Sequence, residues 1–148
     1  MDRTPRIRNF ITNFLEKHNF KFRRIHQIRP ENPVEIFPGF TVDMIEADSD
    51  DEYSYLIDSG LIIYWDGFVI YNSNDCGPCK KGKKYIVDKY KNIYLALLRY
   101  SGGAGYPSCY LNLSHEEKTE EKERIEKERM NEFISNTLEL SPKYVMPF

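Results

Sequence analysis

The tetrapeptide Cys76-Gly77-Pro78-Cys79 is the part of the sequence with the clearest capacity for chemistry. Two intervening residues let the two sulfurs bond to each other, and a helix that begins at such a motif lowers the pKa of its first thiol. The spacing therefore predicts either a redox pair, with Cys76 as nucleophile and Cys79 as resolving thiol, or two ordinary reduced thiols in a loop.

The motif resembles the active site of the thioredoxins, because a β-prone segment precedes it and a helical segment follows it. This resemblance implies thiol-disulfide exchange through Cys76 and Cys79. Beyond the motif the sequence departs from the family. Asp75 stands where thioredoxins have a tryptophan, and a lysine-rich run replaces their apolar first helical turns. Tyr106-Pro107 is the only candidate for the family's cis-proline.

The same cysteines are compatible with a zinc site. Cys76 and Cys79 have the spacing of a zinc knuckle, and Cys109 with His115 would complete a Cys₃His ligand set. Such a set also arises by chance in many chains, so the spacing alone does not establish a metal site. The four lysines around Gly82 allow a further alternative, contact with a phosphate or a nucleic-acid backbone. Loops of this kind are more often solvated, and the acidic overall charge makes nucleic acid an unexpected partner.

Charge is distributed very unevenly along the chain. Residues 1–30 carry a net charge of +6, residues 31–75 of −11, residues 76–110 of +6 and residues 111–148 of −3. The acidic stretch contains no lysine or arginine, and its densest part is the segment that holds Asp48, Asp50, Asp51 and Glu52. Alternating signs can neutralise one another within the fold. The sharper interpretation is an acidic surface, centred on these four residues, that binds a basic protein partner.

The elements that position these groups follow from hydrophobic periodicity. Leu61–Trp65 and Phe68–Tyr71 flank Asp66-Gly67, which predicts a two-residue hairpin with both sheet faces covered. Ser114 and Glu117 form a capping box that opens a charged helix. Further strands are predicted at about 20–28, 34–37, 40–46, 53–58 and 106–113, and further helices at 5–18 and across the apolar positions from Ile86 to Leu98.

The predicted fold class is α+β. One domain, residues 1–148, contains an antiparallel meander sheet of about five or six strands. An N-terminal helix, a helix after the cysteine loop and a long charged C-terminal helix flank this sheet. The last of these, residues 114–140, should project or dock through Met130, Phe133, Ile134 and Leu138, before an apolar tail at residues 144–148 that packs elsewhere.

Composition limits the function classes. No apolar run is long enough to span a bilayer, the first residues lack a secretion signal, and three cysteines without such a signal suit a reducing compartment. We therefore expect a cytoplasmic protein, or one of the host cytoplasm or virion if it is viral. No complete catalytic set is visible. The sequence favours a small non-enzymatic interaction protein of the inhibitor, immunity or viral accessory or structural type, without a required cofactor. The alternative is a thiol-disulfide or zinc-dependent protein.

Overall fold

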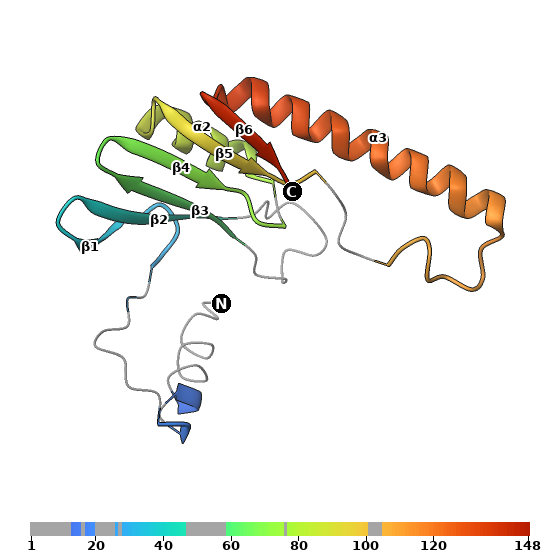
Figure 1. Cartoon of the computed structure of the whole chain (residues 1–148), viewed down its shortest axis with the longest axis horizontal. Helices are drawn as coiled ribbons and strands as arrows, with labels where there is room; N and C mark the ends of the chain where they lie inside the picture. Colours follow the sequence, from blue (N-terminus) through green and yellow to red (C-terminus); the bar gives the residue numbers. More distant parts are fainter. Residues whose placement is uncertain are drawn as a thin grey trace.

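The computed structural model describes residues 13–15, 17–19, 26, 28–46, 59–75, 77–100 and 105–148. Its named elements are β1 (Val34–Phe37), β2 (Phe40–Glu46), β3 (Ser59–Trp65), β4 (Phe68–Asn72), α2 (Lys80–Lys89), β5 (Ile93–Leu98), α3 (His115–Leu140) and β6 (Tyr144–Pro147). The protein is thus mixed α/β with a six-stranded sheet, which confirms the coarse prediction (Figure 1).

The sheet is not the antiparallel meander that the sequence predicted. Its strands follow chain order from β1 to β6, and the first four pair antiparallel. The β4–β5 and β5–β6 pairs are parallel, because α2 and α3 each return the chain to the same end of the sheet. A parallel pair needs such a crossover. The first parallel pair was not predicted, because the helix expected through Leu98 took the place of β5.

The hairpin prediction is confirmed at its turn. Asp66 and Gly67 have φ angles of 48° and 81°, and Trp65 pairs directly with Phe68. Positive φ at both central residues defines the turn whose twist suits two adjacent antiparallel strands. The β1–β2 connection at Pro38-Gly39 also forms a turn, with Gly39 at φ 79°.

The helix predicted through Leu98 is wrong in its second half. α2 ends at Lys89, and Ile93–Leu98 forms β5 between β4 and β6. This stretch is apolar at consecutive positions, so it fits a helical stripe and a buried strand equally well. Because β4 and β6 pair with its two edges, this stretch forms a strand. The strand buries Ile93, Ala96 and Leu98.

Three other boundaries differ from prediction. The expected strand at 106–113 is a series of turns in which Leu111 is 98% exposed. Ser59 and Gly60 begin β3 instead of ending an earlier strand. The apolar tail is β6, which packs as an edge strand on β5. Residues 13–15 and 17 are helical, while the remainder of the predicted N-terminal helix, most of the strand at 20–28 and all of 53–58 lie outside the described residues.

Only one face of the sheet carries the described core. Ile45, Ile62, Tyr71 and Leu98 project from the strands to meet Ile86 of α2 and Leu140 of α3. In Figure 1 the strands lie toward the viewer and α2 lies behind them. The opposite side includes Trp65, 58% exposed, so the expectation that both faces of the hairpin are covered is wrong. No helix among the described residues is long and apolar enough to cross a membrane.

Candidate interaction surface

The cysteine loop lies where the sequence placed it, between a strand and a helix. Cys79 is the N-cap of α2, and its Sγ accepts a hydrogen bond from the Gly82 backbone N–H at 3.2 Å. Cys76 lies outside the described residues. The Tyr106–Pro107 bond is cis, as the resemblance required, but it leads into turns and not into a strand.

A charged clasp holds this loop against α3. The guanidinium of Arg99 donates to both carboxylate oxygens of Glu132 at 2.9 Å and to the backbone carbonyl of Asp75. Arg129 adds a hydrogen bond of 2.9 Å to the same glutamate. A Cβ at Gly77 would lie 2.5 Å from Glu132 Oε1, so a larger residue there would require the Glu132 side chain to shift. The glycine of the motif therefore has a packing role.

The structure does not assemble the proposed zinc ligands among the described residues. No group of three or more histidine, cysteine, aspartate or glutamate side chains suited to a metal occurs in the described part of the chain. Cys79 and Cys109 are both free thiols there, and Cys109 is exposed. Because Cys76 is not described, the four-ligand set with Cys79, Cys109 and His115 stays a prediction.

The lysine cluster is partly used within the fold. Lys81 pairs with Glu31 at 3.1 Å, and Lys83 pairs with Glu139 at 2.8 Å. The lysine holds the pKa of the Glu139 carboxyl below its ordinary value. Internal neutralisation thus accounts for two of the four lysines. The segment with Asp48, Asp50, Asp51 and Glu52 lies outside the described residues, so its acidic surface stays a prediction.

The sequence reasoning missed a buried polar cluster around Asp43. This carboxylate is 0% exposed, and its Oδ2 accepts hydrogen bonds from Tyr85 at 2.6 Å and Tyr90 at 2.7 Å. Lys89 Nζ lies 3.5 Å away. Burial and the neighbouring carboxylate raise the pKa of both tyrosines, so both stay protonated donors. Neither phenol can act as a base in this arrangement, which joins β2 to α2. No signal in the sequence indicated it, because Asp43 alternates with Thr41 and Ile45 on the more polar side of β2.

The first half of α3, residues 115–128, is here called the arm. It carries seven glutamates against four lysine and arginine side chains. Arg124 pairs with Glu121 at 2.6 Å and with Glu128 at 2.5 Å along its surface. The arginine holds the pKa of Glu121 at about 2, so this acid stays ionised. The predicted capping box is present, with Ser114 and Glu117 each bonded to the other's backbone. Figure 1 shows the arm extending beyond the strands.

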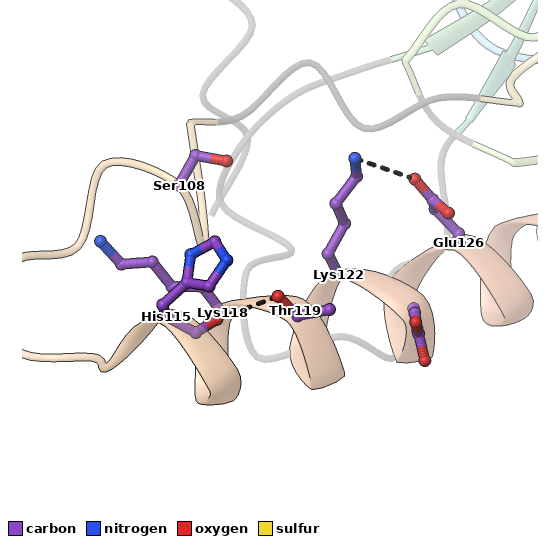
Figure 2. A pocket seen from close by; sticks show the side chains of 7 residues that line it. Ser108, His115, Lys118, Thr119, Lys122 and Glu126 are labelled. Carbon is purple, nitrogen blue, oxygen red and sulfur yellow. Dashed lines mark hydrogen bonds and ion pairs between the residues drawn. The ribbon is translucent and has the colours of Figure 1, made fainter.

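An open pocket of about 580 Å³ lies between the arm and the turns before it. Figure 2 shows Ser108 across from side chains of α3, among them Lys122 and Glu126, whose charged groups are 3.7 Å apart. The lining is Ser108, His115, Lys118, Thr119, Lys122, Glu123 and Glu126. It mixes both charges and lacks the apolar enclosure typical of a small-molecule site.

The second half of α3 docks, but not through all the residues predicted. Phe133 packs on the core and against the ring of Tyr100, with centroids 6.0 Å apart. Met130, Ile134 and Leu138, here called the α3 stripe, are 40%, 46% and 74% exposed. Four-residue spacing places the three on one side of the helix, which therefore carries an uncovered apolar line beside its packed side.

Comparison with protein-family models found no match to the chain, and comparison with curated proteins found no similar sequence.

Proposed function

We propose that this chain is a small non-enzymatic interaction protein that presents α3 to a protein partner. The observation that carries the proposal is the α3 stripe. Exposed apolar side chains are ordinary when scattered. Three of them at positions i, i+4 and i+8 of a regular helix form the line of anchors that a helix inserts into an apolar groove.

Charge indicates the chemistry of the partner. The arm continues the same helix with a net charge of −3, and the line of the stripe continues toward the N-terminus through Glu126, Lys122 and Lys118, of which Glu126 pairs with Lys122. A groove with basic residues at its rim would complement this acidic extension. The proposed partner is thus a protein with a basic surface, and the acidic segment Asp48–Glu52 would add to its attraction.

Affinity capture from extracts of the native cells tests the role of the stripe. The tagged wild type is compared with the double variant Ile134→Gln/Leu138→Gln, which removes apolar surface without changing charge. Asn131→Gln/Ser135→Gln is the matched control, because both positions are exposed on the same helix. We expect one protein that the wild type and the control retain and the stripe variant loses. Retention of the same proteins by all three would contradict the proposal.

The electrostatic part has a separate readout. Replacement of Asp48, Asp50 and Asp51 by Asn and of Glu52 by Gln should slow association with the captured partner more than it accelerates dissociation. The association rate of the wild type should also fall with added salt, because exposed charges are screened over roughly 10 Å at 0.1 M ionic strength. Equal association rates and equal salt dependence would assign the acidic segment to internal neutralisation alone.

A further inference from the structure

The side of the sheet opposite α2 is apolar across all six strands. Directly paired residues of neighbouring strands project to the same side, so the strand register identifies the members of this surface. The outer face, as we name it, consists of Val34, Phe37, Phe40, Val42, Met44, Leu61, Ile63, Trp65, Phe68, Ile70, Asn72, Leu95, Leu97, Tyr144 and Met146, together with Tyr94, whose ring contacts Phe68 and Tyr144. Among these members none is charged and Asn72 has the one amide, while beyond Met44 and Leu61 the same register continues to the pair Glu46 and Ser59.

Aromatic side chains form a continuous row along one end of this face. Phe37 stacks on Phe40 with centroids 4.6 Å apart, and register joins Phe40 to Trp65 and Trp65 to Phe68. The row continues from Phe68 to Tyr94 at 4.8 Å and from Tyr94 to Tyr144 at 5.3 Å. Lys143 lies over the last two rings and marks the rim. Rings fixed by their neighbours lose little freedom on contact, which favours binding.

The exposed area approaches that of a protein interface. Phe37, Trp65, Phe68, Tyr144 and Met146 are each between 46% and 58% exposed, and Leu61 is 37% exposed. Large side chains bury about 150–250 Å² each, so these six leave about 600 Å² of mostly apolar surface in water. The half-buried members of the face add to this. A stable interface takes about 800 Å² from each partner, whereas single patches on monomers are about 300–600 Å².

The distribution of charge on the molecule favours a second copy of the chain over a charged partner protein as the occupant of the outer face. α2 and the arm carry charged side chains, so a partner chosen by charge would bind those surfaces and not the outer face. Two copies of the outer face can meet without placing like charges opposite each other. A partly exposed apolar side of a sheet is suited to packing against a second layer, and another sheet supplies one at about 10 Å.

We propose that the outer face is the contact surface of a symmetric homodimer in which two sheets pack face to face. The same surface on each copy then covers the other, as two-fold symmetry requires. This inference is independent of the partner proposed for α3.

Light scattering over a concentration series tests the dimer. The wild type should have twice the mass of the 17.6 kDa chain and dissociate on dilution. Leu61→Glu and Trp65→Glu, which place a charge on the outer face, should remain folded and monomeric. Leu138→Gln serves as the matched control, because it alters only the α3 stripe and should stay dimeric. A wild type that is monomeric at every concentration would overturn the proposal, as would outer-face variants that remain dimeric.

Trp65 provides a readout that needs no variant. It is the only tryptophan in the chain and is 58% exposed, so its fluorescence reports directly on the outer face. On dilution of the wild type, its emission should shift to longer wavelength and become more accessible to iodide. Emission that is shielded from iodide in a monomer would show that another part of the same chain covers the face. A protein that binds the outer face in place of a second copy would leave the purified chain monomeric. Either result would contradict the dimer.

Discussion

The Asp43 carboxylate places a charge on the core side of the sheet, where burial of an unpaired charge would be costly. Its two tyrosine donors and Lys89 keep it compensated, while its second oxygen accepts the Met44 N–H at 2.9 Å. Removal of one donor leaves a buried acceptor incompletely satisfied, which costs more free energy than removal of both partners of the hydrogen bond. The cluster therefore joins α2 to β2 through hydrogen bonds that are costly to break one at a time.

Tyr90→Phe should lower the free energy of unfolding by about 1–3 kcal/mol, because Asp43 loses a donor and the ring stays in place. The matched control is Tyr106→Phe, whose hydroxyl donates to Glu121 at 3.0 Å on an exposed surface. The control should change stability by less than about 0.5 kcal/mol. Denaturant titration of the three proteins measures both values. Equal stabilities for Tyr90→Phe and the wild type would contradict the role given to the cluster.

The same variant has an expected pH dependence. The pKa of Tyr90 in the folded protein lies above its ordinary value of 10.0, so the folded state keeps this proton longer than the unfolded state does. Its contribution to stability is therefore complete below pH 10 and is lost as the pH rises beyond that value. The alkaline decline in stability should be steeper in the wild type than in Tyr90→Phe.

Cys79 illustrates how far single residues can be interpreted from sequence. The motif correctly indicated a strand before it and a helix after it. It could not indicate that the second thiol would cap the helix, or that Gly77 would lie against the Glu132 carboxylate, since that contact joins residues far apart in the chain. Asp43 was likewise not identifiable as buried, because its tyrosine partners lie in α2 and at its C-cap, more than forty positions away.

Among the elements, the β3–β4 hairpin was the most predictable. Both turn residues and both strands lie within a dozen positions, so local preferences alone define it. The capping box of α3 is local for the same reason. β5 and β6 were not predictable in this way, because an apolar run becomes a strand only when neighbours pair with it. The outer face was not predicted, because the alternation of residues along a strand does not reveal which segments cover each side of the sheet.

Gly67→Val should destabilise the protein by about 1–3 kcal/mol, since a β-branched residue resists the φ of 81° found there. Gly67→Asn provides the control, because asparagine tolerates positive φ. No side chain or backbone lies within 4 Å of a Cβ at this position, so a difference between the two variants reports backbone conformation alone. Thermal melts compare them. An unchanged melting temperature for the valine variant would mean that the turn does not constrain the hairpin.

At the scale of the whole molecule, two uncovered apolar surfaces lie on separate elements. The outer face belongs to the strands, and the α3 stripe belongs to the helix that returns the chain to β6. Their surroundings differ, since the outer face is uncharged and the stripe continues into an acidic arm. If both proposals hold, a second copy and a basic partner would bind the same molecule at separate surfaces.

The most direct test is photo-crosslinking in the native cells with a benzophenone amino acid at position 138. Leu138 is 74% exposed at the end of the α3 stripe, so this change preserves the fold and places the reactive group on the proposed contact. Val87, 42% exposed on α2, is the control position. The account predicts a light-dependent adduct with a second, basic protein from position 138 and none from position 87. No adduct at position 138, or the same adduct from both positions, would contradict it.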